Sequence, residues 1–205
     1  MLLGEFVQLY YTKSSPFANN VRAVITEIGI SEQINLLECH PFNNDSEFLA
    51  VSSLGKVPCL VADGETITDS EVICDYLDAS YTGGTLFNTI YADWRLKTFY
   101  SICSGLMEVC VARRVEIVRA KDGSQSVFWL QRHNNAIIRA LEDIETRLAL
   151  MPDEFSILHI NLINCLAYLD FRHQDINWRN TQPNLEQFFQ AFSSRPCFIE
   201  NRLTD

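Results

Sequence analysis

The chain has 205 residues, a hydrophobic fraction of 47%, a charged fraction of 20% and a formal net charge of -10, with a pI of about 4.8. This length is enough for one large domain or two small ones. The acidic balance argues against a nucleic-acid-binding protein, which needs a basic surface to displace counterions from phosphates, and against docking on anionic lipid.

Targeting and metal signals are missing from the sequence. The first residues, MLLGEFVQLYY, lack a basic region and carry Glu5, so no signal peptide is expected. The longest apolar run, INLINCLAYL, is shorter than the roughly 20 residues that cross a bilayer. The seven cysteines form no C-x-x-C pair and the four histidines show no metal-ligand spacing. We therefore expect a cytoplasmic, globular protein without a metal ion.

The first part of the chain alternates short β-type runs with helical patterns. Residues 6–11, FVQLYY, predict a strand. Apolar residues at helical spacing from Pro16 to Ile28 predict a helix that ends at Gly29. Residues 34–39, INLLEC, predict a second strand, which a polar loop with at most a short helical turn follows.

A hairpin signal comes next. In VPCLVADGETIT, two apolar runs flank Asp63-Gly64, the strongest two-residue hairpin signal. The residues from Asp69 onward then form a helical pattern. The order βαβ-ββα predicts a small mixed sheet with helices packed on it.

Strand patterns stop after YTGGT at residues 81–85. Apolar spacing predicts long helices over residues 91–115 and 127–148. The segment ILHINLINCLAYLDF is apolar nearly all round, which is typical of a buried central helix, and a shorter helix follows Pro183.

The predicted fold class is therefore α+β, in two domains. An α/β domain covers residues 1–80, a linker covers 81–89, and an all-α helical bundle covers 90–205.

Three blocks of the sequence resemble signature blocks of cytosolic glutathione S-transferases, most closely the bacterial members of the serine-type group. They are SSPFANNVRAVITEIGI, SLGKVPCLVADGETITDSEVICDYL and NCLAYLDFRHQDINWRNTQPNLEQFFQAFSSRPCF. The resemblance implies a thioredoxin-like N-terminal domain, a helical C-terminal domain, glutathione as co-substrate, a small hydrophobic electrophile as second substrate, and a homodimer.

The first block suggests how such a protein makes a thiolate, since a free thiol titrates near pH 8.5. Ser15 directly precedes Pro16, which suits the first position of a helix, so Ser15 is expected to be the N-cap. A helix N-terminus contributes roughly 0.3–1 kcal/mol and a hydrogen bond to a charged sulfur roughly 1.5–3 kcal/mol. Together they would lower the thiol pKa by about one to three units.

The resemblance places the residue before Pro16 against the glutathione sulfur, so Ser15 is the predicted catalytic residue. Ser14 is the first alternative and Tyr11 the second. A serine here cannot form a mixed disulfide, which disfavours thiol transfer through the enzyme.

The second block implies the rest of the glutathione site. By resemblance, Val57-Pro58 has a cis peptide bond, and Val57 offers its backbone groups to the cysteinyl part of glutathione. The pair Asp69-Ser70 begins a helix and, by resemblance, binds the γ-glutamyl end. Lys56 would pair with the glycyl carboxylate, although a solvated surface lysine is the competing interpretation.

Two positions depart from the family pattern. The buried helix usually begins Ser/Thr-x-x-Asp, whereas here it reads Ser156-Ile-Leu-His159. Histidine is a poorer acceptor, so we expect a loss of about 1 kcal/mol unless the helix begins at Asp153. Ser52-Ser53 also replaces a common Asn-Pro.

The third block is expected to pack the domains. Asp170 and Arg172, with Trp178-Arg179 and Arg195-Pro196, would need hydrogen bonds or partners if buried, so we expect a structural polar network.

The electrophile pocket is the least defined part of the prediction. Tyr11, Phe99, Cys103 and Met107 are its candidates, and each fits an ordinary core position as well.

The leading hypothesis is a glutathione transferase acting on an electrophilic or peroxide substrate. The alternative is a non-catalytic transferase-fold regulator that binds a protein partner, as stringent-starvation-type proteins bind RNA polymerase. The glutathione motifs Val57-Pro58 and Asp69-Ser70 favour the enzyme. A glutaredoxin-like thiol oxidoreductase would need a cysteine near Pro16, and none is present.

Overall fold

The computed structural model describes residues 7–205. Residues 1–6, with Phe6 at the start of the predicted first strand, lie outside the described residues. The chain divides into two compact units, Met1–Phe87 with Arg195–Asp205, and Asn88–Ser194. The division after Phe87 falls within the predicted linker.

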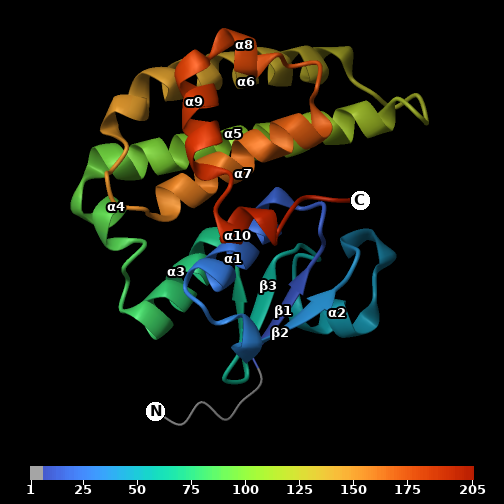
Figure 1. Cartoon of the computed structure of the whole chain (residues 1–205). Coiled ribbons are helices and arrows are strands. Elements are labelled where there is room, and N and C mark those ends of the chain that lie inside the picture. Colours follow the sequence, from blue (N-terminus) through green and yellow to red (C-terminus); the bar gives the residue numbers. More distant parts are fainter. Residues whose placement is uncertain (1–6) are drawn as a thin grey trace. The chain divides into compact units, whose positions relative to one another are not determined.

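A four-stranded mixed sheet forms the centre of the first unit (Figure 1). Its strands are β1 (Val7–Tyr11), β2 (Ile34–Glu38), β3 (Cys59–Ala62) and β4 (Glu65–Thr68). The order is β2-β1-β3-β4, with β1 parallel to β2 and the other two pairs antiparallel. Asp63 and Gly64 close the β3–β4 hairpin with φ of 52° and 76°, the positive values that a tight two-residue turn requires. The predicted mixed sheet and hairpin are confirmed.

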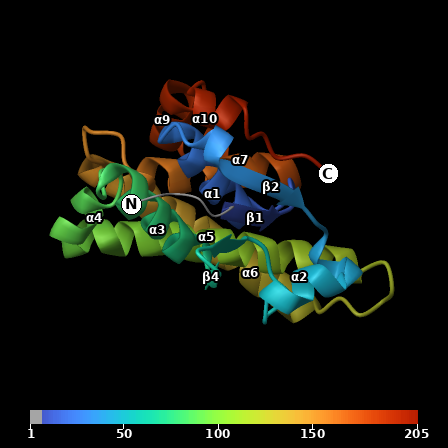
Figure 2. The ribbon, with the colours of Figure 1, turned by 90° about the horizontal axis from the view of Figure 1, so that it is seen from below.

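Helices cover both faces of this sheet. They are α1 (Pro16–Glu27), α2 (Ser46–Val51) and α3 (Ser70–Thr82), with 3-10 turns at Ser31–Gln33 and Pro41–Asn43. Successive side chains of a strand point to opposite faces. Arg22 of α1 lies over the ring of Tyr11, while Phe48 of α2 packs against Tyr10, with ring centroids 5.8 Å apart. The two helices therefore lie on opposite faces, and α3 packs with α1, away from α2 (Figures 1 and 2).

The C-terminal segment belongs to the first unit, not to the helical one as the sequence analysis expected. Helix α10 (Pro196–Ile199) packs on α1, and both views show the two side by side (Figures 1 and 2). Arg195 pairs with Glu27 at 2.5 Å, and the Asn201 side chain donates to the Thr26 hydroxyl at 2.9 Å. These contacts join residues distant in sequence, so no local sequence pattern predicts them.

A buried carboxylate fixes the end of α3. Asp78 is fully buried and accepts hydrogen bonds from the backbone N–H groups of Leu86 at 2.9 Å and Phe87 at 3.0 Å. The Thr82 hydroxyl also donates to this carboxylate at 2.5 Å. Because donors of the same unit satisfy the Asp78 carboxylate, this residue has a structural role.

The second unit is entirely helical in its described secondary structure. It contains α4 (Asn88–Ala92), α5 (Trp94–Arg119), α6 (Val127–Arg147), a 3-10 turn at Leu148–Leu150, α7 (Ile157–Arg172), α8 (Trp178–Thr181) and α9 (Pro183–Phe192). The long helices α5 and α6 lie side by side and α7 packs on α5 (Figure 1). Helix α7 is buried nearly all round, as predicted. Over residues 7–205, no helix combines the length and apolar character needed to cross a membrane.

The start of α7 corrects the expectation about His159. The helix begins at Ile157 after the N-cap Ser156, not at Asp153. The Ser156 backbone N–H donates to the His159 Nδ1 at 3.2 Å, and the Ser156 hydroxyl lies 3.1 Å from the same nitrogen. An imidazole nitrogen that accepts a hydrogen bond thus takes the place of the usual carboxylate oxygen, so the capping box is complete.

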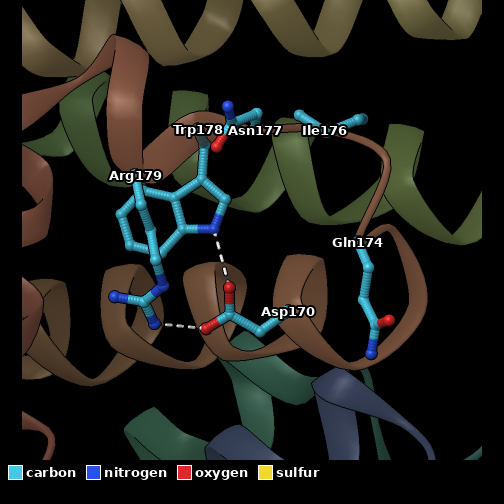
Figure 3. Close-up of a pocket in the computed structure, with 6 residues that line it drawn as sticks. All are labelled: Asp170, Gln174, Ile176, Asn177, Trp178 and Arg179. Carbon is cyan, nitrogen blue, oxygen red and sulfur yellow. Dashed lines mark hydrogen bonds and ion pairs between the residues drawn. The ribbon is translucent and has the colours of Figure 1, made fainter.

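A polar network surrounds Asp170 of α7, as the sequence predicts (Figure 3). The Trp178 indole N–H donates to Asp170 at 2.9 Å, and Arg179 pairs with Asp170 at 2.5 Å while lying over the Trp178 ring. The cavity beside them has a volume of about 290 Å³. Arg179 also pairs with Glu186, so the charged groups are partnered within the unit and the network is structural. Arg172 instead lies over the ring of Phe171.

A second polar network fixes the protonation state of His173. Arg113 donates to the His173 Nδ1 at 2.6 Å, the His173 Nε2 lies 2.9 Å from the Cys110 carbonyl, and Arg113 also pairs with Asp175. Facing a guanidinium, Nδ1 has to accept, so the proton resides on Nε2 and the ring is neutral. Burial, supplemented by the Arg113 charge, lowers the pKa of His173 from 6.5 to about 4.

This network predicts a pH dependence of stability. The unfolded chain takes up a proton on His173 at higher pH than the folded chain, so the free energy of unfolding should fall as the pH drops from 6.5 to about 4. The loss from this residue should total about 3 kcal/mol. Urea unfolding across this range measures it, and His173→Asn, which keeps an acceptor for Arg113 but does not titrate, is the matched variant. Equal pH slopes in the two proteins would contradict the assignment.

Candidate active site

The strand register brings three distant segments to one edge of the sheet. Tyr10 of β1 pairs with Cys59 of β3, and Cys59 pairs with Thr68 of β4. Because β3 is antiparallel to both neighbours, its first residue lies beside the last residues of β1 and β4. The start of α1, the Val57-Pro58 peptide and the start of α3 therefore meet at this edge.

Ser15 is the N-cap of α1, as predicted. Its backbone is extended, with φ of -84° and ψ of 120°, and its Oγ accepts from the Ala18 N–H at 3.2 Å. Pro16 occupies the first turn, which contains no acidic residue. Since Oγ uses a lone pair for the cap, the hydroxyl hydrogen remains able to donate to an anion at the helix end. Ser14 lies in the preceding turn and is half-buried.

Val57-Pro58 has the cis peptide bond that the resemblance implied. Ser52 fixes the loop leading to it: this buried hydroxyl accepts from the Lys56 N–H at 3.1 Å and donates to the Lys56 carbonyl at 3.0 Å. The Lys56 side chain is exposed. Ser52, noted in the sequence only as a departure, therefore positions the residue before Val57. A serine whose hydroxyl bonds the backbone four residues later is a local signal, but many loops contain such a serine.

Asp69 begins α3 in an unusual backbone conformation. Its φ is 76° and its ψ is 132°, and its Oδ1 caps the helix by accepting from the Glu71 N–H at 2.8 Å. A non-glycine residue in such a sparsely populated region costs about 1–3 kcal/mol. The conformation places Ser70 at the first position of α3, so that the carboxylate, the hydroxyl and the free N–H groups occupy one helix end.

Arg22 is a second site feature that the sequence analysis missed. It is 8% exposed, and its guanidinium carbon lies 5.0 Å from the centre of the Tyr11 ring. Among the described residues, its Nε and Nη1 have no hydrogen-bond partner. A cation–π contact contributes about 0.5–2 kcal/mol, whereas burying a charge costs several kcal/mol. The aromatic ring alone does not offset the burial.

The predicted electrophile-pocket residues are found in both units. Tyr11 ends β1, and Phe99, Cys103 and Met107 are buried on α5. Burial raises the pKa of the Cys103 thiol far above its usual range, so this thiol is unreactive. The pocket itself stays a prediction.

Over residues 7–205, no group of three or more His, Cys, Asp or Glu side chains is arranged to hold a metal ion.

Two family models of known proteins match this chain. The glutathione S-transferase N-terminal domain model matches residues 9–85, and the C-terminal domain model matches residues 128–191. Glutathione S-transferase 3 of Zea mays is 22% identical over 202 residues, covering 94% of this chain and 91% of that protein.

Solved structures of glutathione transferase family members are also similar to this chain. A glutathione transferase family member from Pseudomonas fluorescens Pf-5, crystallised with bound glutathione, superposes with a TM-score of 0.87 at 29% identity, covering 97% of this chain and 100% of that one. A structure of a Pf-5 family member with bound S-(propanoic acid)-glutathione gives a TM-score of 0.85 at 30% identity over the same shares. Taken with the cis Val57-Pro58 bond and the two capped helix ends, these matches show that the chain belongs to the glutathione S-transferase family.

Proposed function

We propose that this protein is a glutathione transferase that binds glutathione at the β1–β3–β4 edge and activates its thiol there. The observation that carries the proposal is the Tyr10–Cys59–Thr68 register, which gathers two helix N-termini at one edge. Two helix ends, each with free N–H groups, suit a ligand with several anionic groups.

In this proposal Ser15 stabilises the thiolate. Its hydroxyl donates to the glutathione sulfur while the α1 N-terminus favours the negative charge. No general base is needed, since the thiol loses its proton to solvent once its pKa lies near or below 7. The thiolate then attacks an electrophilic carbon, whose leaving group departs with its bonding electron pair. With a hydroperoxide it attacks the terminal oxygen, the O–O bond breaks, and glutathione sulfenic acid and an alcohol form, the alcohol oxygen taking a proton from solvent.

The other groups hold the tripeptide. The Asp69 carboxylate accepts from the γ-glutamyl ammonium, and the Ser70 N–H and hydroxyl meet the α-carboxylate at the α3 N-terminus. The Val57 backbone pairs with the cysteinyl residue, and the Lys56 ammonium reaches the glycyl carboxylate. A small hydrophobic electrophile occupies a pocket formed by Tyr11, Phe99, Cys103 and Met107. We also propose a cytoplasmic location, which fits seven cysteines that are all free.

Asp69→Asn tests glutathione binding. Asparagine tolerates positive φ and keeps the cap, so the free energy of unfolding should change by less than about 0.5 kcal/mol. Loss of the charge-assisted contact should weaken glutathione binding about 10- to 100-fold in calorimetry.

The control is Asp63→Asn. Asp63 is also an acid at positive φ, but it lies in the β3–β4 turn, at the opposite end of those strands. Its replacement should leave affinity unchanged. If wild-type protein binds no glutathione, the transferase proposal is overturned and the non-catalytic regulator becomes the better hypothesis.

Ser15→Ala tests the catalytic role. Removing the hydroxyl should raise the thiol pKa of bound glutathione by about one to two units, since a hydrogen bond to a charged group is worth roughly 1.5–3 kcal/mol. Titration of thiolate ultraviolet absorbance in the binary complex measures this. Ser14→Ala should leave the pKa unchanged. A shift seen only in Ser14→Ala would transfer the role to Ser14.

We propose that the protein is a homodimer. Large apolar side chains are exposed on the described surface, among them Leu54 at 71%, Val72 at 53% and Trp94 at 76%. Exposed apolar groups of this size are typical of contact surfaces. Light scattering after size exclusion should give twice the 23.5 kDa mass of the chain. A single-chain mass at micromolar concentration would contradict the dimer.

A further inference from the structure

Arg22 carries a buried positive charge that forms no ion pair with a residue of the described part of the chain. Its side chain is 8% exposed, and neither Nε nor Nη1 has a hydrogen-bond partner among residues 7–205. Its guanidinium lies over the face of the Tyr11 ring. An arginine stays charged at any physiological pH, so the charge cannot be removed by deprotonation.

The charges around Arg22 leave an excess of positive charge. Glu38 is the carboxylate that acts on Arg22, but it is paired with the Lys13 ammonium at 2.7 Å. Lys13 itself repels Arg22. Lys13 and Arg22 thus have only Glu38 as a nearby acid, and Glu38 is paired with Lys13, the more exposed of the two cations.

Arg22 lies at the edge where the reaction is proposed. Its partner ring belongs to Tyr11, the last residue of β1, and Ser15 follows only four residues later. In the proposed complex the charged groups of glutathione already have partners, at Ser15, Lys56 and Asp69-Ser70. Of the two substrates, the electrophile is therefore the one that can bring an anion to Arg22.

We propose that Arg22 binds a carboxylate carried by the electrophile, so that the enzyme prefers electrophiles with an apolar body and an acid group. This inference rests on the proposed transferase function and names its substrate class. A guanidinium N–H donates a charge-assisted hydrogen bond to a carboxylate oxygen, which orients the substrate as well as attracting it. Arg22 is then a specificity-determining residue.

With 3-bromopropanoate as the model substrate, the chemistry balances without another reactant. The glutathione thiolate attacks the carbon that carries bromine, the C–S bond forms, and bromide leaves with the C–Br electron pair. The carboxylate is unchanged and stays on Arg22.

Binding of stable conjugates tests the proposal without turnover. The probes are S-(carboxymethyl)-, S-(2-carboxyethyl)- and S-(3-carboxypropyl)glutathione, each paired with its neutral primary amide of the same shape. Calorimetry on the full chain should show at least one acid binding tenfold or more tightly than its amide. Arg22→Met should abolish that preference while leaving the affinity for the amide and for glutathione within about twofold.

Lys13→Met is the matched control. It removes the neighbouring cation, which is half-exposed and already paired, and it should leave the preference intact. If both variants reduce the preference equally, the general positive field and not Arg22 is responsible, and the proposal is overturned.

The outcomes separate the two proposals. Wild-type protein that binds glutathione but binds every acid no better than its amide overturns the carboxylate inference and leaves the transferase function standing. Wild-type protein that binds neither glutathione nor any conjugate overturns both. The comparison of each acid with its amide in the wild-type protein can overturn the inference by itself. The inference therefore stays testable even if Arg22→Met does not fold.

Discussion

The pairing of Cys59 with its two neighbours is the constraint on which the site depends. Cys59 faces Tyr10 on β1 and Thr68 on β4, and its own strand follows directly from the cis Val57-Pro58 peptide. A slip of one residue would move every side chain of β3 to the other face of the sheet. The same slip would separate the start of α1 from the start of α3. The buried, apolar side chains of β3 hold this register.

Helix capping and anion binding at this edge are one physical arrangement. Ser15 and Asp69 each satisfy an N–H in the first turn of a helix, and each retains a group that faces outward, a hydroxyl hydrogen in one case and carboxylate lone pairs in the other. The unusual backbone at Asp69 shows that this placement is held against a local energetic cost. Capping stabilises the fold, and the remaining donor and acceptor supply the chemistry.

Three buried polar groups that the fold satisfies contrast with Arg22, two of whose donors it leaves without a partner among the described residues. Asp78, Ser52 and His173 are buried and hydrogen-bonded to neighbours in their own units. Arg22 is buried to a similar degree, but Nε and Nη1 lack partners among the described residues. Satisfied groups contribute to stability and need no ligand to explain them. The exception is therefore where a ligand is to be sought.

The sequence by itself determined the elements with strong local signals: the Asp63-Gly64 hairpin, the cap at Ser15 and the apolar helix from Ile157. Each depends on residues a few positions apart, where spacing and turn chemistry act directly. The short helices α4, α8 and α10 give no periodic signal at four or five residues. The C-terminal segment groups with the first unit because α10 packs on α1, a helix far away in the sequence. Only the tertiary structure decided that the C-terminal segment joins the first unit and that Arg22 is buried without an ion pair to any described residue. Contacts between residues far apart in sequence depend on how whole elements pack, which no local pattern records.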